Sequence, residues 1–353
     1  MKALVLAGGK GSRLRPITHT SAKQLIPVAN KPILFYGIEA IKEAGITDIG
    51  FIIGDNGNEI ISAVGDGSRW GIKATFIEQE APLGLAHAVK IAEDYIAEEP
   101  FLMFLGDNLL KNGIKSVVDD FKSNSPNAQI LLAKVKNAQD FGVAELSGKK
   151  VVKLVEKPKK PKSDLALVGV YLFDKNIFKA VNSIKPSKRG ELEITDAIQY
   201  LIDNKYKVDS YKVDGWWKDT GKLEDIIEAN RLFLDTVNPL IKGEVDDASR
   251  IEGKVIVELG ACIKGSHIRG PAVIGEGCII IDSYIGPFTS LYRNIKIEGS
   301  ELENSIVLQD SSIRDIKRIE GSLIGQNVRI SKNVQKPAAY RIMVGDSSQV
   351  EVL

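Results

Sequence analysis

A glycine-rich segment near the N-terminus, followed by several cations, has the composition of a phosphate-binding loop. Residues 8–11 read Gly-Gly-Lys-Gly directly after an apolar run at residues 3–7, and Arg13, Arg15 and Lys23 come next. Glycines let backbone N–H groups approach a chain of phosphates, and arginine and lysine add charge-assisted donors. The spacing is neither that of a Walker motif nor that of a dinucleotide fingerprint. The segment therefore predicts a phosphate site, with a glycine-rich turn beside a solvated basic surface as the alternative.

The same segment opens a series of motifs that continues to residue 221. The first 33 residues contain GGKGSRLRPIT, SAKQLIPV and NKPI. Further along stand QEAPLGLA, LGDN, FGV, VEKP, GELEITD and WKDTG, in this order. Together they resemble the sugar-phosphate nucleotidyltransferases, whose signature is GGxGxRLxPxT with a downstream lysine. Within that family, KQL with Gln24 and the GELEITD segment resemble the branch that transfers thymidylate to glucose 1-phosphate.

The resemblance implies a reaction and the residues that perform it. Enzymes of this family join a nucleoside triphosphate, here dTTP or UTP, to a sugar 1-phosphate and release pyrophosphate. Charge at the α-phosphorus calls for cations and a metal ion rather than a protein nucleophile. The resemblance assigns Mg²⁺ to Asp107 and Asp219, since two carboxylates with phosphate oxygens suit a hard cation. It assigns the triphosphate to Arg13 and the bridging of the phosphates to Lys23.

The remaining contacts that the resemblance implies divide between the two substrates. The nucleoside and its phosphates are assigned to the backbone of Leu6, Ala7, Gly8 and Gly9. The pyrimidine is assigned to Gln79 and Gly84, with Pro82 and Leu85 shaping the pocket. The sugar phosphate is assigned to Gly142, Glu156, Lys157, Gly169 and Tyr171. Among these, Lys157 is expected to meet the phosphate and Glu156 the sugar hydroxyls.

Taken one at a time, the same residues also have structural interpretations. Asp107 and Asp219 each fit a hydrogen-bonded turn. The adjacent Glu156 and Lys157 fit an exposed ion pair, and Lys23 alone fits a surface lysine. Tyr171 lies in an apparent strand and is expected to pack as well as to contact substrate. The catalytic interpretation is favoured by the combination of all the motifs in the order of the family.

The elements that must position these residues alternate between strand and helix up to about residue 235. Strands are expected at 3–7, 49–53, 74–77, 101–105 and 129–135, and helices at 32–44, 86–96 and 117–122. This alternation is typical of an α/β, Rossmann-like domain with a mostly parallel sheet covered by helices. We place it at residues 1–240. Loops that follow the strands of such a sheet bind small ligands.

A different period begins at residue 251, where apolar residues recur every 17 positions. The three series are Ile251, Ile268, Ile285, Leu302 and Ile319; Val257, Ile274, Leu291 and Leu308; and Ile263, Ile280 and Ile297. Steps of six, six and five residues predict triangular coils, and the repeat resembles the left-handed β-helix of hexapeptide-repeat proteins. Later in the chain Ile324 replaces position 325 of the second series, and Ile313 replaces position 314 of the third. An isoleucine-rich β-sandwich is the alternative.

Two segments flank this all-β domain, which we place at residues 251–353 with a C-terminal tail. Residues 241–250 contain a glycine and an acidic pair, and they are predicted to form a linker. Residues 343–352 are a candidate for a small hairpin around Gly345 and Asp346. A solenoid with flat apolar faces packs readily against copies of itself, so a homo-oligomer built through the β-helix is expected.

Composition narrows the function further. A formal net charge of +1 gives no general attraction to nucleic acid or to an anionic membrane. Two cysteines are too few for a disulfide framework or a cysteine-based zinc site, and three scattered histidines are too few for a histidine-rich metal site. No apolar run approaches the roughly 18 residues of a membrane span, and the N-terminus lacks a signal-peptide pattern. We therefore expect a cytoplasmic protein.

Three alternatives remain open at this level. Thymine and uracil differ by one methyl group, so the first alternative is a UDP-sugar pyrophosphorylase. Acyl transfer in the β-helix would need a general base, for which His267 is the candidate in that domain. A scaffold subunit without activity would have lost its catalytic groups, whereas Arg13, Lys23, Asp107 and Asp219 are all present.

Overall fold

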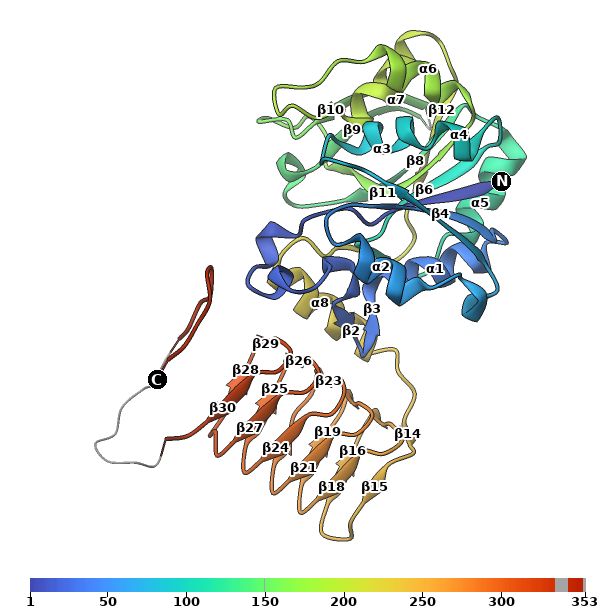
Figure 1. Ribbon diagram of the computed structural model, residues 1–353. Coiled ribbons are helices and arrows are strands. Elements are labelled where there is room, and N and C mark those ends of the chain that lie inside the picture. Colours follow the sequence, from blue (N-terminus) through green and yellow to red (C-terminus); the bar gives the residue numbers. More distant parts are fainter. Residues whose placement is uncertain (149, 334–341, 352–353) are drawn as a thin grey trace. The chain divides into compact units, whose positions relative to one another are not determined.

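The computed structural model describes residues 1–148, 150–333 and 342–351 (Figure 1). Contacts between Cα atoms group the chain into two compact units. The first contains Met1–Lys10, Ser21–Leu25 and Ile33–Asp219, and the second contains Gly11–Thr20, Ile26–Pro32 and Thr220–Leu353. The second unit therefore takes two short segments from the N-terminal region of the chain. None of the described helices is both long and apolar enough to cross a membrane.

The first unit is built on a nine-stranded sheet. Its spatial order is β5 (Lys73–Glu78), β4 (Asp48–Ile53), β1 (Lys2–Leu6), β6 (Phe101–Leu105), β11 (Leu165–Phe173), β8 (Ala128–Lys134), β12 (Val208–Lys212), β10 (Lys150–Glu156) and β9 (Gly142–Ser147). Neighbours from β5 to β6 are parallel, as are β8 and β12. The pairings of β11 and β10 are antiparallel. Seven of the nine strands thus run in one direction, which confirms the mostly parallel sheet.

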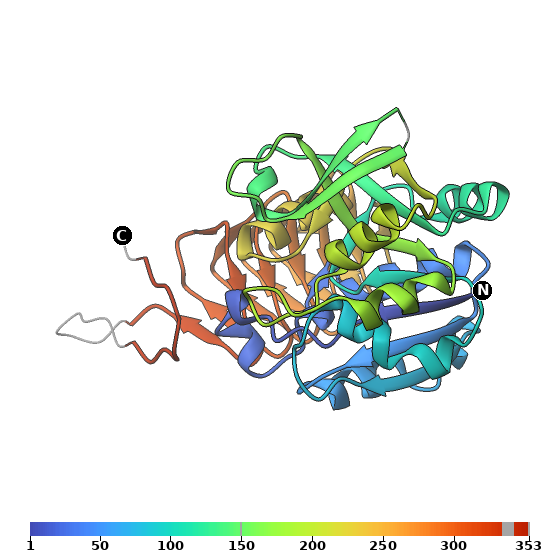
Figure 2. The same cartoon turned by 90° about the horizontal axis from the view of Figure 1, so that it is seen from above.

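Helices cover both faces of this sheet, and its central strands β1, β6 and β11 are accordingly apolar at nearly every position. Along β1, Leu4 packs on one face of the sheet, and Ala3 and Val5 pack on the other. The face of Leu4 is covered by α3 (Leu85–Ile91), α4 (Glu93–Ile96), α6 (Asn176–Ser183) and α7 (Ile194–Asp203). The opposite face is covered by α1 (Ile33–Glu43), α2 (Gly57–Val64) and α5 (Lys115–Asn124). Figure 1 shows these layers, and Figure 2 shows them from above.

The sequence predictions for this unit hold with small shifts at the ends of elements. The helix expected over 86–96 is divided at Ala92 into α3 and α4. The unit also contains short elements that the sequence patterns did not predict. These are a two-stranded sheet of β7 (Asn108–Leu110) and β13 (Trp217–Asp219), and the 3₁₀ helices η3 (Lys23–Leu25), η4 (Ser68–Trp70) and η5 (Ala138–Asp140).

The second unit contains a solenoid of three parallel sheets, consistent with a left-handed β-helix. The first sheet is β14 (Leu240–Ile241), β17 (Val255–Val257), β20 (Ala272–Ile274), β23 (Thr289–Leu291), β26 (Ile306–Val307) and β29 (Leu323–Ile324). The second is β15 (Glu244–Val245), β18 (Cys262–Lys264), β21 (Ile279–Ile281), β24 (Lys296–Glu298), β27 (Ser312–Arg314) and β30 (Arg329–Ser331). The third is β16 (Arg250–Glu252), β19 (His267–Arg269), β22 (Tyr284–Ile285), β25 (Glu301–Glu303) and β28 (Ile319–Glu320).

Other elements of the second unit precede the solenoid in the sequence. They are η1 (Ser12–Leu14), η2 (Ile17–His19), the hairpin of β2 (Pro27–Val28) and β3 (Lys31–Pro32), and helix α8 (Leu223–Leu234). Asn230 of α8 is 1 % exposed and forms hydrogen bonds with both the hairpin and the solenoid. Its Oδ1 accepts hydrogen bonds from Ala29 N (2.8 Å) and Ser290 Oγ (2.7 Å), and its Nδ2 donates to Phe288 O (3.0 Å). This side chain therefore holds the hairpin, the helix and one coil together.

The register of the coils confirms the 17-residue repeat and corrects one of its members. Ile251, Ile268, Ile285, Leu302 and Ile319 are successive partners in the third sheet. In the first sheet, however, Leu291 pairs with Val307 rather than with Leu308. Ile297 pairs with Ile313, as expected for the third series. The physical reason is a short corner between β25 and β26, which brings Val307 into the core one position early.

The segment expected to be a linker instead belongs to the first coil. Within residues 241–250, β15 pairs with β18, and the beginning of β16 pairs with β19. The acidic pair contributes to a corner: Asp246 accepts hydrogen bonds from Ser249 Oγ (2.5 Å) and Gly265 N (3.1 Å). Of the hairpin suggested at 343–352, the described residues show a turn closed by Ser348 N and Gly345 O (3.4 Å), without strands, and Val352 lies outside them.

Candidate active site

The glycine-rich segment begins at the carboxyl end of β1, beside the ends of β4 and β6. Ala7 N donates to Ile52 O (2.8 Å), and Gly106 N donates to Leu6 O (2.9 Å). The backbone of Gly8 passes so close to Gly54 that a Cβ on Gly54 would lie 2.9 Å from Gly8 O. The carboxyl ends of parallel strands are where ligands bind in such sheets. The backbone of residues 6–9 therefore lies at an edge of the sheet where a ligand can bind.

Lys23 and the two predicted metal ligands converge in the first unit. Lys23 Nζ lies 2.5 Å from Asp107 Oδ2 and 3.9 Å from Asp219 Oδ1. The Lys23 side chain is only 7 % exposed, whereas those of Asp107 and Asp219 are 24 % and 31 % exposed. Burial of a cation without a partner is costly, so the two carboxylates explain why this lysine can be buried. The surface-lysine interpretation of Lys23 is therefore wrong.

The pairing of β7 with β13 brings the two aspartates together from distant parts of the chain. Asp219 is the register partner of Asn108, the residue that follows Asp107. Burial alone would raise the pKa of Asp107, but the Lys23 ammonium and hydrogen bonds from Lys23 and Asn108 lower it below its usual value. Asp107 is therefore ionised at neutral pH. The carboxylates of Asp107 and Asp219 thus lie near the same ammonium group.

Asn108 is a buried residue of this site that sequence reasoning did not single out. Its Nδ2 donates to Asp107 Oδ1 (2.9 Å), and its Oδ1 accepts from Gly169 N (3.1 Å) and Trp217 Nε1 (2.5 Å). A Cβ on Gly169 would lie 2.7 Å from the Asn108 side chain. Gly169 thus makes room for the residue that orients Asp107. The only sequence signal was its place in the LGDN motif.

The donor set fits a divalent cation that keeps part of its water shell. Asp107 and Asp219 lie within reach of the same ammonium, and carboxylates are ligands that Mg²⁺ prefers. In the parts of the chain that the structure describes, no group of three or more histidine, cysteine or acidic side chains could hold a metal ion. A cation at this place would therefore take its other ligands from waters and substrate phosphates.

Arg13 belongs to the second unit. It lies in η1 with an exposed side chain, and its guanidinium nitrogens are 3.0–3.3 Å from the position of a Cβ on Gly221. Gly221 ends the WKDTG motif, which begins on β13. The absence of a side chain at Gly221 leaves the guanidinium its space. This packing links two motifs that lie more than 200 residues apart.

A second cluster surrounds Glu156, at the end of β10. Its register partner is Gly142 of β9, where a Cβ would lie 2.8 Å from Thr195 Cγ2. Thr195 Oγ1 donates to Glu156 Oε2 (3.3 Å), and Arg189 Nη1 lies 3.6 Å from Glu156 Oε1. Burial and the nearby Glu193 carboxylate raise the pKa of Glu156. Arg189 and Thr195, which border or belong to the GELEITD segment, were not among the predicted site residues.

Lys157 and Tyr171 have opposite surroundings. Lys157 is exposed, with a φ of 40°, and its backbone N donates to Phe141 O (3.0 Å). Tyr171 is 4 % exposed and stacks on Phe173 at 6.0 Å between ring centroids. Burial and the Glu156 carboxylate raise the pKa of Tyr171, so its hydroxyl stays protonated. The expectation that Tyr171 packs in the core is confirmed.

The predicted base-binding residues lie on the loop between β5 and α3. Gln79 N donates to Ile53 O (2.8 Å), which fixes the start of the loop. Pro82 is exposed, and Leu85 is the first residue of α3. Gly84 has a φ of 103°, and a Cβ there would lie 2.4 Å from Leu192 O. No other residue type fits this position without moving the loop.

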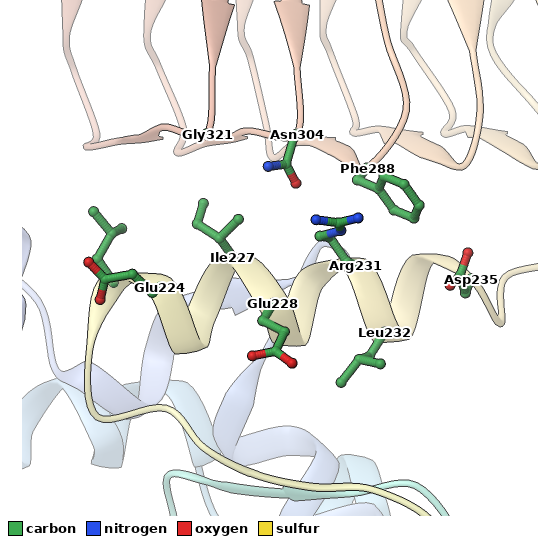
Figure 3. A pocket seen from close by; sticks show the side chains of 10 residues that line it. Glu224, Ile227, Glu228, Arg231, Leu232, Asp235, Phe288, Asn304 and Gly321 are labelled. Carbon is green, nitrogen blue, oxygen red and sulfur yellow. The ribbon is translucent and has the colours of Figure 1, made fainter. Parts of the chain in front are cut away.

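One cavity of about 650 Å³ lies within the second unit, and none of the predicted site residues is among those that line it (Figure 3). It is lined on one side by α8 and on the other by corners of the coils at Phe288, Asn304 and Gly321. The Arg231 guanidinium lies 4.7 Å from the Phe288 ring centroid and is satisfied there as a cation–π pair. His267, the candidate base for acyl transfer, lies instead on β19 with Nε2 3.3 Å from Glu252 Oε2.

Comparison with known proteins identifies the class that this fold and site define. The nucleotidyl transferase family matches residues 2–236, and the chain belongs to this family. It is 55 % identical to the glucose-1-phosphate thymidylyltransferase of Streptomyces antibioticus, over 100 % of this chain and 99 % of that protein. It is 47 % identical to the low-salt glycan biosynthesis nucleotidyltransferase of Haloferax volcanii, over the full length of both chains.

Solved structures show the same relationship for about two thirds of the chain. A putative glucose-1-phosphate thymidylyltransferase from Bacillus anthracis in complex with a sucrose superimposes with a TM-score of 0.62 and 36 % identity. That match covers 66 % of this chain and 94 % of the other. A UDP-glucose pyrophosphorylase complexed with UDP-glucose has a TM-score of 0.60 and 26 % identity, over 66 % and 98 %. The chain is therefore a nucleotidyltransferase, as its motifs predicted.

Proposed function

We propose that this chain transfers thymidylate from dTTP to α-D-glucose 1-phosphate, which yields dTDP-glucose and pyrophosphate. The observation that carries the proposal is the convergence of Lys23, Asp107 and Asp219 on a nucleotidyl transferase fold. The choice of substrates is supported by relatives from Streptomyces antibioticus and Streptomyces griseus, which are 55 % and 53 % identical and carry the corresponding name.

The proposed reaction is an in-line displacement at phosphorus. A phosphate oxygen of the sugar phosphate attacks the α-phosphorus of dTTP, and the bond from that phosphorus to the oxygen of the departing pyrophosphate breaks. Positioned cations stabilise such a transition state, and no protein nucleophile is needed. Lys23 would bridge the phosphates, and Arg13 would hold the triphosphate. The backbone of residues 6–9 would bind the nucleoside and its phosphates.

The sugar phosphate would bind beside Glu156. Its hydroxyls would donate to the Glu156 carboxylate, which Thr195 and Arg189 orient. Lys157 would meet the phosphate, and Gly142 would leave the space for the sugar. Gly169 would act through Asn108, and Tyr171 would form the floor of the pocket. The pyrimidine would face Gln79 and Gly84, with Pro82 and Leu85 at the rim.

Mg²⁺ belongs to this proposal, with Asp107 and Asp219 as its protein ligands. When bound, it would neutralise charge on the phosphates during transfer. The family membership and the two converging carboxylates support this assignment. Isothermal titration with Mg²⁺ in the presence of a non-hydrolysable dTTP analogue tests it without turnover. Binding that is equally tight in wild type and in Asp107→Asn would contradict the assignment.

The experiment that tests the function is pyrophosphate release in a grid of substrates. It combines dTTP and UTP with the 1-phosphates of glucose, galactose, N-acetylglucosamine and mannose, in the presence of Mg²⁺. A maximum at dTTP with glucose 1-phosphate is the expected result. A maximum at UTP with an amino sugar keeps the mechanism and contradicts the substrates. Absence of release in every combination contradicts the enzyme function.

UTP is the second candidate nucleotide. The likeness to a UDP-glucose pyrophosphorylase favours it, and a pocket that merely accommodates a methyl group discriminates by only about 1–3 kcal/mol. We expect UTP to be used, but less well than dTTP.

We also propose that the chain works in the cytoplasm as a homo-oligomer built through its β-helix. Exposed apolar side chains on the solenoid support such assembly, among them Leu240, Ile241, Leu259 and Ile279. Light scattering coupled to size exclusion gives the mass directly. A monomer at micromolar concentration would contradict this part of the proposal.

A further inference from the structure

The carboxamide of Gln79 is held by two acceptors on neighbouring residues. Gln79 Nε2 lies 3.3 Å from Gly84 O and 3.0 Å from His87 Nδ1. A carbonyl oxygen only accepts hydrogen bonds, so the amide nitrogen, and not Oε1, must face Gly84. The second amide hydrogen then points at His87 Nδ1, which must be the unprotonated ring nitrogen. Both hydrogens of the amide are thereby used.

The two acceptors are themselves fixed. Leu192 N donates to Leu83 O (2.8 Å), and Ala86 N donates to Leu192 O (3.0 Å), so the loop is tied to the backbone around Leu192. The close approach of Gly84 to Leu192 leaves the Gly84 carbonyl little freedom. His87 lies on α3, whose neighbouring residues Ala86 and Ala88 are 0 % and 1 % exposed. The amide of Gln79 therefore has one preferred orientation.

This orientation leaves only Oε1 of the Gln79 side chain available to a ligand. No described residue donates a hydrogen bond to Gln79 Oε1, and Gln79 is half-buried. The group left for a ligand is an acceptor. Thymine and uracil carry an N–H at N3 that an acceptor can bind. Cytosine carries a lone pair at N3, which an acceptor repels.

We propose that His87 is a positioning residue that selects the base, because its imidazole fixes Gln79 with Oε1 toward the nucleotide. This inference rests on the proposed function, in which Gln79 faces the pyrimidine. It makes the site selective for pyrimidines with N3–H, and it makes the selection depend on a residue that does not itself touch the base. Without the second acceptor, only the longer contact with Gly84 O (3.3 Å) holds the amide, which can then rotate and present its nitrogen to N3 of cytosine.

The charge state of His87 agrees with this role. Burial and the nearby Lys90 lower the pKa of His87, against a smaller opposing effect of Glu80. The imidazole is therefore neutral at pH 7 and above, as an acceptor at Nδ1 must be. The proposal itself stands on the two distances and on the chemistry of a carboxamide.

The test compares three variants of the full-length protein with wild type at pH 8. His87→Phe keeps a ring but has no acceptor, and His87→Asn places Oδ1 close to the position of Nδ1. Lys90→Met, on the same helix, is the matched control. The measurement is kcat/KM for dTTP and for dCTP, from pyrophosphate release with glucose 1-phosphate and Mg²⁺.

We expect the ratio of kcat/KM for dTTP over dCTP to fall at least tenfold in His87→Phe. The change should lie mainly in KM for the nucleotide, because His87 affects nucleotide binding rather than the chemical step. In His87→Asn and Lys90→Met the ratio should stay within threefold of wild type. If His87→Phe does not fold, as judged by its melting curve, His87→Leu replaces it. A ratio unchanged in the variant without an acceptor overturns the inference.

The same experiment separates this inference from the proposed function. If wild type releases no pyrophosphate with dTTP, the proposed function fails and the inference fails with it. If wild type is active and prefers dTTP, but all three variants keep the same ratio, only the role of His87 is wrong. A fall of the ratio in His87→Asn as large as that in His87→Phe also overturns it, because the acceptor would then be irrelevant.

Discussion

The active-site region of the first unit and the β-helix of the second treat buried polar groups in opposite ways. In the β-helix, Ser266, Ser283 and Ser300 occupy the same corner of successive coils and are 2–7 % exposed. Each hydroxyl donates to a carbonyl two residues earlier and accepts from a backbone N–H of the following coil. Every partner is supplied by the repeat itself, so these groups are fully satisfied without charge.

In the first unit, the buried polar groups carry charge and crowd one another. Lys23 is enclosed beside two carboxylates, and Glu156 lies near the carboxylate of Glu193. Such clusters lower stability, because charges lose hydration and like charges repel. The repeat thus satisfies its buried polar groups without charge, whereas the first unit buries charged groups that we propose are placed for a ligand. Four substitutions test this division.

The largest effect is expected from Asp107→Asn. The change removes a charge from the Lys23 cluster and from the proposed metal site, so kcat should fall about 10³-fold. Circular dichroism should show the same secondary structure as wild type. Asp119→Asn is the control, because Asp119 forms an exposed pair with Lys115 at 2.8 Å. Near-normal turnover at saturating Mg²⁺ would show that the cluster is structural, as the β-helix serines are.

Glu156→Gln should separate activity from stability. The variant cannot accept sugar hydroxyls as a carboxylate does, so kcat/KM for glucose 1-phosphate should fall about 100-fold. Because the folded pKa of Glu156 is raised, its ionisation disfavours folding above that pKa, and this cost is absent below the ordinary value near 4.5. The variant should therefore be at least as stable as wild type at pH 7.

The pH dependence of wild type provides the second readout for Glu156. KM for glucose 1-phosphate should rise as pH falls through the raised pKa, because the acceptor becomes protonated. Glu98→Gln is the control, since Glu98 is 84 % exposed and pairs with Lys175 on the surface. A variant that is less stable than wild type at pH 7, with unchanged KM, would place Glu156 among the structural groups.

Asn230→Ala tests the second unit at its most connected side chain. The change leaves Ala29 N, Ser290 Oγ and Phe288 O without their partner, so the free energy of unfolding should fall by about 3 kcal/mol. At temperatures well below the midpoint, turnover per folded molecule should stay within twofold. Asn124→Ala, on an exposed face of α5, is the control for denaturant titration. A large loss of turnover in the folded variant would contradict the proposed division, in which the neutral buried groups of the second unit supply stability rather than activity.

The smallest effect is expected from Ser300→Ala in the serine series. Ile316 N would lose its acceptor, which should lower the free energy of unfolding by about 1 kcal/mol. Ser322→Ala, at another corner of the last coil, is the comparison and should cost less, because the Ser322 hydroxyl donates to Glu320 O but accepts no hydrogen bond from a described residue. Activity should be unchanged in both. Equal costs at the two positions would contradict the view that stacking between coils satisfies these hydroxyls.

The two regions also differ in how much of their structure the sequence predicted, because one of them repeats and the other does not. In the solenoid, a 17-residue period specifies the register directly, and Ile251 to Ile319 pair as expected. The exception is Val307, where a corner lost one residue and the neighbouring Leu308 is also apolar. Apolar alternation alone does not say which of two adjacent residues faces inward. The first coil was mistaken for a linker because its polar corner at Asp246 looks like a loop.

In the first unit, motifs identified residues but not their partners. Lys23, Asp107 and Asp219 were predicted, yet nothing in their spacing implied that β7 and β13 would pair. Asn108, Arg189 and His87 were missed, because each acts by orienting a neighbour that is close only in the folded chain. Their residue types are common on protein surfaces, so composition carried no signal for them.

By itself, then, the sequence determined the two architectures and the family, since hydrophobic period and motif order are local properties of a chain. Only the tertiary structure decided that Lys23 is buried between two carboxylates, that Asn108 orients Asp107, and that Gln79 has one amide orientation. The physical reason is that hydrogen bonds and ion pairs depend on distances of a few ångströms between residues that lie up to about 200 positions apart. Those distances are set by strand register and close backbone packing, which no local pattern encodes.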